Sequence, residues 1–335
     1  MKKKFAIVGC GHIAHRHVKH INDHKLGEII GAYDIDLQQL NLFSSKYGLK
    51  AYLSLEEMLG DAEIDVVNIC TPNGTHAEIA ISVLKSGKHT VVEKPMSISI
   101  RAAKEMKEVA EKTGKTLFVV KQNRYNPPVK AVKKLIEDNK LGNILMVSVN
   151  CFWNRNAEYY KQSAWRGTKN LDGGTLYTQF SHFVDVLYYL FGEIENVQGT
   201  VANTSHQDLI EFEDSGSFSF GFKNGGIGNL AFTTSAFEQN MEGSITIFAE
   251  NATIKIGGKY LNTIDYQVTD GFNIADVATS SPANNYGFYE GSMSNHDKVI
   301  DNVIETLNGR QEAMTNATEG LKVVEMISQL YSSTK

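Results

Sequence analysis

Short apolar runs alternate with helical repeats of apolar residues along the first third of the chain. An apolar run at 5–8 is followed by a helical pattern over 12–24, and a second run at 27–33 is followed by another over 36–47. The alternation continues to residue 120, with strands expected at 66–70, 91–92 and 116–120 and helices at 75–86 and 99–113. Strands and helices that alternate in this way predict a doubly wound, parallel α/β sheet.

The pattern changes near Asn126-Pro127-Pro128, and strands dominate after a short helix expected at 129–138. Residues 217–222 alternate small residues with Phe, which is the period of a sheet with one covered face. Further strands are expected at 144–153, 227–233, 244–250 and 253–256, and helices at about 174–191, 294–307 and 317–332. We therefore expect an α/β domain over 1–122 and an α+β domain with a mostly antiparallel sheet over 123–335.

The composition is that of a soluble globular protein with room for two domains. Of the 335 residues, 42% are apolar and 21% are charged, and no run approaches transmembrane length. The net charge of -5 argues against a nucleic-acid partner. Cys10, Cys70 and Cys151 lack the spacing of a disulfide framework or a metal site. The apolar stretch after the basic start is too short for a signal peptide, so we expect a cytoplasmic protein without a metal.

A dinucleotide-binding fingerprint, Gly9-Cys10-Gly11-His12-Ile13-Ala14, follows the first strand. Gly9 permits the tight turn, and Gly11 lets a pyrophosphate approach the backbone. His12 and Ile13 open the next helix, whose N-terminus faces the phosphates. A glycine turn without a ligand is the alternative, but the strand before it, the helix after it and an acid at the end of the second strand favour a nucleotide.

That acid is Asp34, which we expect to accept hydrogen bonds from the adenosine ribose. Its carboxylate repels the 2′-phosphate of NADP, so we predict NAD; the alternative is a solvated turn aspartate. Thr71, Asn73 and His76 follow the strand at 66–70, where the nicotinamide half of the cofactor passes. Asn73 or Thr75 would serve equally well as a helix cap.

Lys94 is the first candidate for chemistry, in the sequence Glu93-Lys94-Pro95 behind the apolar run at 91–92. In open α/β sheets, ligands bind outside the carboxyl ends of the strands. The ammonium would stabilise the alkoxide of a substrate hydroxyl as hydride leaves. A lysine after a strand is most often a surface residue, but Pro95 fixes the backbone and suits an oriented side chain.

A polar stripe on an apolar helix is the second candidate. Thr178, His182 and Asp185 fall at i, i+4 and i+7. Histidine acts as a general base near neutral pH. The alternative is a core histidine satisfied by Asp185; with a redox cofactor implied, we favour the base.

The third candidate is a set of cations, Lys121, Arg124 and Arg166. Arginine binds phosphate or carboxylate groups through two parallel hydrogen bonds. A solvated charged face is the competing interpretation, above all for Arg124.

Together these motifs resemble the glucose–fructose oxidoreductase/inositol dehydrogenase (Gfo/Idh/MocA) family. The resemblance rests on the glycine fingerprint, on Glu93-Lys94-Pro95 and on the Gly-Gly to His-Phe-Val-Asp segment at 173–185, and it covers nearly the whole chain. It implies a Rossmann domain, an open antiparallel sheet domain that forms oligomers, a tightly held NAD(P), and redox chemistry on a sugar or polyol hydroxyl.

Within the family, the stretches 117–124, 146–153, 159–168 and 242–247 resemble NAD-dependent dehydrogenases that oxidise the 3-hydroxyl of UDP-N-acetylglucosaminuronic acid for surface polysaccharides. The diphosphate and carboxylate of that substrate suit the three cations. One departure is Thr178, where many members have aspartate. A hydroxyl cannot hold the negative charge that raises the basicity of His182, which argues against a proton relay there and against inositol or glucose dehydrogenases.

We therefore expect an NAD-dependent dehydrogenase, a homodimer or homotetramer, in which His182 takes the proton and Lys94 stabilises the oxyanion; which of the two is the formal base stays open. Glu93 and Gln122 are expected at the cofactor, and Asn123 and Thr178 at the substrate. The alternatives are a related dehydrogenase acting on another sugar or polyol, and a non-catalytic NAD-binding regulator.

Overall fold

The computed structural model describes residues 1–274, 277, 283–285 and 290–334, which form two compact units. The first unit holds Met1–Lys121 and His296–Val324, and the second holds Gln122–Asn295 and Glu325–Lys335. The chain first passes from the first unit to the second between residues 121 and 122, one residue before the expected boundary at 122/123. The segment 296–324, which the sequence pattern assigns to the second domain, instead packs with the first unit. Within the described residues, no helix is long and apolar enough to cross a membrane.

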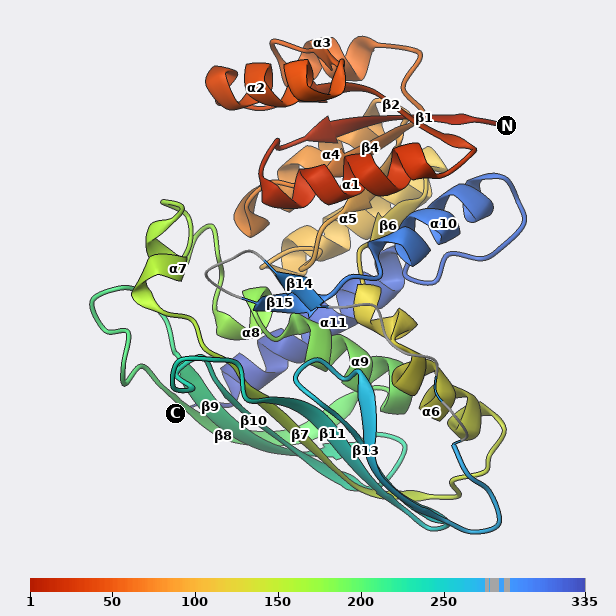
Figure 1. Cartoon of the computed structure of the whole chain (residues 1–335), viewed down its shortest axis with the longest axis vertical. Coiled ribbons are helices and arrows are strands. Elements are labelled where there is room, and N and C mark those ends of the chain that lie inside the picture. Colours follow the sequence, from red (N-terminus) through yellow and green to blue (C-terminus); the bar gives the residue numbers. More distant parts are fainter. Residues whose placement is uncertain (275–276, 278–282, 286–289, 335) are drawn as a thin grey trace. The chain divides into compact units, whose positions relative to one another are not determined.

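A six-stranded parallel sheet forms the centre of the first unit, as the α/β alternation predicts (Figure 1). Its strands are β1 (Lys3–Val8), β2 (Gly27–Tyr33), β3 (Lys50–Ala51), β4 (Val66–Ile69), β5 (His89–Val92) and β6 (Leu117–Val119), in the order β3-β2-β1-β4-β5-β6. Strand β1 is buried over residues 5–8 and pairs with β2 on one side and β4 on the other. The strand order therefore reverses at β1, and such a switch point is where open sheets bind ligands.

The helices that connect these strands are α1 (His12–Asp23), α2 (Leu37–Tyr47), α3 (Leu55–Gly60), α4 (His76–Lys85) and α5 (Ile100–Thr113). Four of them, α1, α2, α4 and α5, end within one residue of the predicted positions. The Asp36 side chain caps α2, and Ser99 caps α5. Gly48 and Gly114 close the same two helices in the left-handed conformation, with φ of 66° and 63°. From the closing segment, α10 (His296–Leu307) packs against α1.

A seven-stranded, mostly antiparallel sheet forms the second unit, and only its central pair β7–β10 runs parallel. Its strands are β7 (Ile144–Phe152), β8 (Ile194–Ala202), β9 (Ser215–Phe222), β10 (Ile227–Thr233), β11 (Glu242–Ala249), β12 (Ala252–Gly257) and β13 (Thr263–Thr269), in the order β13-β12-β11-β7-β10-β9-β8. The three phenylalanines of β9 are buried, as the alternation predicts. A separate pair joins β14 (Ala283–Asn285) and β15 (Glu290–Met293). The expected fold class is confirmed, although β3, α3, β8, β13, β14 and β15 were not predicted.

The helices of the second unit are η2 (Gln122–Tyr125), α6 (Pro127–Glu137), α7 (Ala157–Lys161), α8 (Thr175–Thr178) and α9 (Ser181–Phe191), and α11 (Ala317–Ser332) passes from the first unit into the second. Helix α6 begins at Pro127, two residues earlier than expected, because proline is well tolerated in a first turn. Figure 1 shows α9 over one face of the sheet, where Phe183 contacts Trp153 with ring centroids 5.6 Å apart.

The single helix expected at about 174–191 is wrong. The structure has two helices, α8 and α9, with Gln179 and Phe180 between them. Both intervening side chains have tertiary partners, since Phe180 packs on Trp153 and Gln179 donates a hydrogen bond to Tyr159 Oη at 2.6 Å. These contacts override the helical period of the sequence. Thr178 therefore lies on α8, while His182 and Asp185 lie on α9, so the three do not form a stripe on one helix.

Candidate active site

The glycine turn lies where β1 and β4 leave the first sheet side by side. Gly9 has φ of 90°, and a Cβ atom there would lie 2.8 Å from the Cys70 carbonyl oxygen. Gly11 has open space where its side chain would be, with no atom within 4 Å of a Cβ, and serves as N-cap of α1. The turn thus requires glycine at the first position for packing, and it leaves the second open for an approaching phosphate. His12 and Ile13 follow directly in the first turn of α1.

Asp34 stands at the end of β2 and holds the glycine turn. Its Oδ2 accepts a hydrogen bond from the Cys10 N–H at 2.7 Å, and its Oδ1 accepts one from the Asp36 N–H at 2.9 Å. Gln39 also donates a hydrogen bond to the Cys10 carbonyl at 2.9 Å. Each carboxylate oxygen offers more than one acceptor direction, so contact with a ribose remains compatible with these bonds. That contact stays a prediction.

Thr71, Asn73 and His76 follow β4, and their side chains differ in burial and in hydrogen-bond partners. Thr71 is half-buried, and its Oγ1 lies 2.8 Å from the Thr75 hydroxyl, while Asn73 is buried in a 3₁₀ turn, η1 (Asn73–Thr75). The His76 ring is fully buried between the Pro95 and Thr71 carbonyls. Both ring nitrogens lie against backbone carbonyls, and a contact of His76 with the cofactor stays a prediction. Thr75 makes no side-chain cap on α4 either.

Lys94 and Glu93 follow β5 and differ in exposure. Lys94 is half-buried, and the Lys94–Pro95 peptide is cis. Glu93 is 7% exposed, and its Oε1 lies 2.9 Å from His17 Nε2. The Glu93 carboxylate is therefore turned toward the interior of the first unit, and its contact with the cofactor stays a prediction.

In the second unit, His182 and Thr178 lie in buried positions on the two helices of the broken segment. His182 is 4% exposed and Thr178 is 8% exposed. The Thr178 hydroxyl donates to the Asp172 carboxylate, whose Oδ2 also accepts from the Gly167 N–H at 2.8 Å. Asp172 thus brings a carboxylate to the position where Thr178 replaces the family's aspartate. Sequence reasoning assigned no role to Asp172, although it precedes the Gly173-Gly174 pair of the same segment.

The Arg124 guanidinium forms a buried, bidentate ion pair with Asp185. Its Nε donates to Oδ2 at 2.9 Å and its Nη2 to Oδ1 at 2.8 Å, and both side chains are 1% exposed. The ring of Tyr189 lies against the guanidinium, 4.7 Å away. Arg124 is therefore no solvated surface charge, and Asp185 accepts two hydrogen bonds from it.

The other expected substrate and cofactor residues of this segment are also buried. Lys121, the last residue of the first unit's opening segment, is 2% exposed, and Gln122 is 3% exposed. Asn123 is 1% exposed and accepts a hydrogen bond from Ser292 Oγ at 2.7 Å. These side chains therefore lie inside the fold rather than on a charged face, and their roles toward ligands stay predictions.

Arg166 lies in the loop after α7 and is half-buried. Its Nη1 donates to the Tyr159 carbonyl at 2.9 Å and to Gln162 Oε1 at 2.9 Å. The guanidinium carbon lies 4.2 Å from the centre of the Tyr159 ring. Stacking and hydrogen bonds orient this cation, which is the condition for binding an anionic group in a fixed geometry.

Arg155 is a cation that sequence reasoning missed. It is 2% exposed and donates from Nε to Gln179 Oε1 at 2.6 Å, at the junction of α8 and α9. Its guanidinium carbon lies 5.0 Å from the centre of the Trp153 ring. The available signal was its place just after the strand predicted at 144–153.

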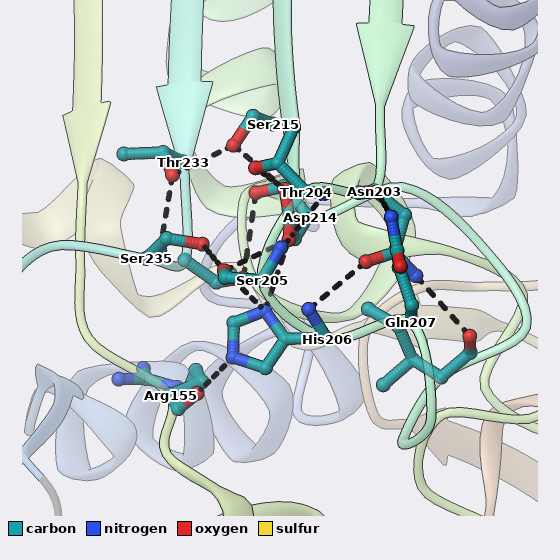
Figure 2. A network of polar contacts seen from close by, with 12 residues as sticks. Arg155, Asn203, Thr204, Ser205, His206, Gln207, Asp214, Ser215, Thr233 and Ser235 are labelled. Carbon is teal, nitrogen blue, oxygen red and sulfur yellow. Dashed lines mark hydrogen bonds and ion pairs between the residues drawn. The ribbon is translucent and has the colours of Figure 1, made fainter.

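Figure 2 shows a polar network that fixes the Arg155 backbone. Ser205, His206 and Asp214 are the residue types of a hydrolase triad, but Asp214 Oδ2 and Ser205 Oγ both lie 3.1 Å from His206 Nδ1. His206 Nε2 lies 2.7 Å from the Arg155 carbonyl oxygen. Because a triad needs serine and carboxylate at opposite ring nitrogens, this network is structural. Burial would raise the pKa of Asp214, but hydrogen bonds from Ser205 and Ser215 help lower it to about 2.

Comparison with known proteins agrees with this architecture. A family model described as oxidoreductase family, NAD-binding Rossmann fold, matches residues 3–121, and a Gfo/Idh/MocA C-terminal domain model matches residues 129–255. The chain belongs to the Gfo/Idh/MocA oxidoreductase family, as its motifs indicate. It is an NAD-dependent sugar dehydrogenase acting on a CH–OH group, so the expected enzyme class and cofactor are confirmed.

Two solved structures are similar over nearly the whole chain. The WlbA dehydrogenase from Chromobacterium violaceum, in complex with NADH and UDP-GlcNAcA, is 36% identical with a TM-score of 0.91, covering 99% of this chain and 93% of its own. The WlbA dehydrogenase from Bordetella pertussis, in complex with the same two ligands, is 35% identical with a TM-score of 0.91, covering 99% and 96%. Glucose-6-phosphate 3-dehydrogenase from Bacillus subtilis is 27% identical, covering 98% of this chain and 95% of its own.

Substitution of the two glycines of the turn should affect different properties, the stability of the fold at Gly9 and the binding of the cofactor at Gly11. Gly9→Ala places a Cβ at φ of 90° and 2.8 Å from Cys70, so we expect a clear loss of thermal stability. Gly11→Ala meets no atom within 4 Å, so it should keep the melting temperature. We expect it to weaken NADH binding by about tenfold or more, measured by fluorescence titration. A Gly11→Ala protein with wild-type affinity would contradict the assignment of this space to the phosphates.

Asp185→Ala should destabilise the protein strongly, because it leaves the Arg124 charge buried without its carboxylate. We expect the free energy of unfolding to fall by about 3–5 kcal/mol, measured by urea denaturation. Asp208→Ala, at an exposed aspartate of the same unit, is the matched control and should change it by less than about 0.5 kcal/mol. Equal effects of the two substitutions would show that the ion pair does not support the fold.

Proposed function

We propose that this protein oxidises the 3-hydroxyl of UDP-N-acetylglucosaminuronic acid with NAD, as a step in nucleotide-sugar synthesis for a surface polysaccharide. The observation that carries the proposal is the likeness, at 35–36% identity over 99% of the chain, to two WlbA dehydrogenases crystallised with NADH and UDP-GlcNAcA. Residues 117–124 and 159–168, among others, gave the same resemblance from sequence alone. We propose a cytoplasmic homodimer or homotetramer as its working state.

The proposed chemistry divides between a proton and a hydride. When bound, NAD⁺ would supply the acceptor for the hydride that leaves C3 of the sugar, and C3 would become a ketone. His182 takes the proton of the 3-hydroxyl, and the Lys94 ammonium stabilises the negative charge that develops on the oxygen. The two could exchange these parts, since an amine and an imidazole both accept a proton. Asp172, which precedes α8, accepts a hydrogen bond from the Thr178 hydroxyl and brings a negative charge to this position.

The acidic groups of the substrate need fixed cations. Arg166 is the cation best placed to contact them, because it is half-buried and oriented by Tyr159. Arg124 is already bound through two hydrogen bonds to Asp185, so we assign it to support rather than to the substrate. Lys121 and Asn123 remain proposed substrate contacts, and Gln122 a proposed cofactor contact.

A second candidate substrate is a free sugar phosphate. The relative from Bacillus subtilis, a glucose-6-phosphate 3-dehydrogenase, matches 98% of the chain, although at 27% identity. Both candidates are anionic sugars oxidised at the 3-hydroxyl, so the reaction is the same and only the recognised anion differs.

Substrate choice is tested by mixing the purified protein with NAD⁺ and each of three sugars while following reduced-nicotinamide absorbance. We expect a signal with UDP-N-acetylglucosaminuronic acid and none with UDP-N-acetylglucosamine, which lacks the carboxylate, or with glucose 6-phosphate. A signal with UDP-N-acetylglucosamine of equal kcat/KM would show that the carboxylate is not read. A signal with glucose 6-phosphate alone would replace the proposed substrate.

Substitution of the two proposed catalytic groups tests their roles. His182→Asn and Lys94→Met should each lower kcat by about 10²–10⁴-fold while NADH affinity stays close to that of the wild type. His89→Asn is a control, because His89 lies at the opposite end of β5 from Lys94. Near-normal turnover in His182→Asn would show that histidine is not the base.

A further inference from the structure

Four buried titratable side chains of the first unit lie close to the Lys94 segment and have no role in the proposed reaction. They are His17, His76, Glu93 and His296, with exposed fractions of 1%, 0%, 7% and 2%. All four come from different elements: α1, the start of α4, the segment after β5, and the start of α10. Burying polar groups costs free energy unless they are hydrogen-bonded. The contacts of two of them, His76 and Glu93, hold the Lys94-Pro95 segment.

His76 holds one side of the Lys94-Pro95 segment. Its Nδ1 lies 2.8 Å from the Pro95 carbonyl oxygen, and its Nε2 lies 2.9 Å from the Thr71 carbonyl oxygen. The ring therefore bridges the segment after β5 to the loop after β4. Since a carbonyl only accepts hydrogen bonds, the contact with Pro95 holds when Nδ1 carries a proton.

Glu93 holds the other side of the same segment. Its Oε2 accepts a hydrogen bond from the Lys94 N–H at 3.2 Å, and its Oε1 lies 2.9 Å from His17 Nε2. His296 Nε2 lies 3.6 Å from the same Oε1. The other ring nitrogen of His17 lies 2.7 Å from the Asn68 side-chain amide of β4. The carboxylate is thus held by α1 through His17, while His296 of α10 lies beyond hydrogen-bond distance.

Electrostatics keep this carboxylate ionised. Burial alone would raise the pKa of Glu93, but the His17 and His296 rings hold it well below its usual range. Burial would likewise lower the pKa of His17, yet Cys70 and Glu93 raise it to about 10. Burial lowers the pKa of His296, and the neighbouring His17 and Arg16 lower it further. The close approach of His17 Nε2 to Glu93 Oε1, at 2.9 Å, therefore pairs the imidazole with a carboxylate that stays ionised.

Two histidines and a carboxylate also form a set able to ligate a metal, with ligand atoms within 4.8 Å of one another. The 2.9 Å separation of His17 Nε2 and Glu93 Oε1 is that of a hydrogen bond, in which a proton lies between the two atoms. We therefore interpret the cluster as an ion pair.

We propose that His76 and Glu93 are positioning residues that hold the Lys94-Pro95 segment from both sides and so set the direction in which the Lys94 side chain leaves the sheet. The inference rests on the role of Lys94 in the proposed function. Neither residue contacts the substrate; each acts through a backbone group, His76 on the Pro95 carbonyl and Glu93 on the Lys94 N–H. A catalytic group displaced by about 1 Å loses up to about 10²-fold in rate.

The test compares two substitutions that each keep one half of the His76 ring. His76→Asn keeps a donor near the position of Nδ1, which faces Pro95, whereas His76→Gln keeps one near Nε2, which faces Thr71. Burial lowers the pKa of His76 and favours the neutral ring, which donates from one nitrogen only, so each variant keeps a donor toward one of the two carbonyls. Melting temperatures of both variants are measured to separate a loss of fold from a loss of rate. We expect kcat to fall about tenfold further in His76→Gln than in His76→Asn, with KM for the sugar nearly unchanged in both. Equal kcat values, or a lower one in His76→Asn, would overturn the proposal.

A second readout does not depend on the identity of the sugar. In protein labelled with ¹⁵N-lysine, the Lys94 amide signal is assigned by its loss in Lys94→Arg. We expect it to move in His76→Gln and in Glu93→Gln and to stay in place in the His89→Asn control. If the signal is unmoved in both variants, His76 and Glu93 do not position Lys94, even if the wild type oxidises the proposed substrate. If the signal moves in the variants but the wild type does not oxidise that substrate, the positioning of Lys94 stands and the proposed function is rejected.

Glu93→Gln decides the matter if neither His76 variant folds, because it preserves side-chain volume and removes the charge. A large drop in kcat with unchanged KM and a shifted Lys94 signal supports positioning; a normal kcat overturns it. Metal analysis of the purified wild type is run in parallel. A stoichiometric transition metal that Glu93→Gln releases would replace the ion pair with a metal centre and overturn this account of the cluster.

Discussion

The close approach of two strand ends at Gly9 is the constraint on which the first unit depends. β1 pairs with β4 in a register that sets Val8 beside Ile69, so the turns that follow must pass each other. A Cβ at Gly9 would lie 2.8 Å from the Cys70 carbonyl oxygen, which leaves no room for a side chain. Helix α1 begins after one turn and helix α4 after the other. Because Gly9 has no side chain, the two turns can pass closely, and this sets the positions of α1 and of the loop at Thr71.

Charged groups inside both units follow one rule: each is held by an opposite charge or by several hydrogen bonds, and each in turn fixes a piece of backbone or a helix. Arg124 and Asp185 join η2 to α9, and Glu93 and His17 join the end of β5 to α1. Asp214 accepts hydrogen bonds from the backbone and hydroxyl of Ser205. Removal of one partner would leave the other charged and buried, so each pair makes the two elements that it joins depend on each other.

The sequence predicted the elements whose pattern is local and missed those whose partners are distant. Apolar runs located β1, β2 and β4, and glycines in the left-handed conformation closed α2 and α5 where expected. Strands β8 and β13 were missed because they lie at the edges of the sheet, where few of their residues are buried. The partner of Arg124 is 61 residues away, and nothing in the order of residues indicates it. The candidate residues were therefore found more readily than their orientations.

Orientation is what distinguishes the residues of the Glu93-Lys94-Pro95 motif. Side chains that continue a strand point alternately to its two faces, and here Glu93 is turned inward to His17 while Lys94 remains half-buried. Adjacent residues of opposite charge thus end in different surroundings: the acid is desolvated and paired, and the amine keeps access to a ligand. In the proposed function, Lys94 is the residue of this motif that acts on the substrate, and Glu93 is the residue that holds the Lys94 backbone. If both are required, the proposed chemistry depends on the interior of the unit as much as on its surface.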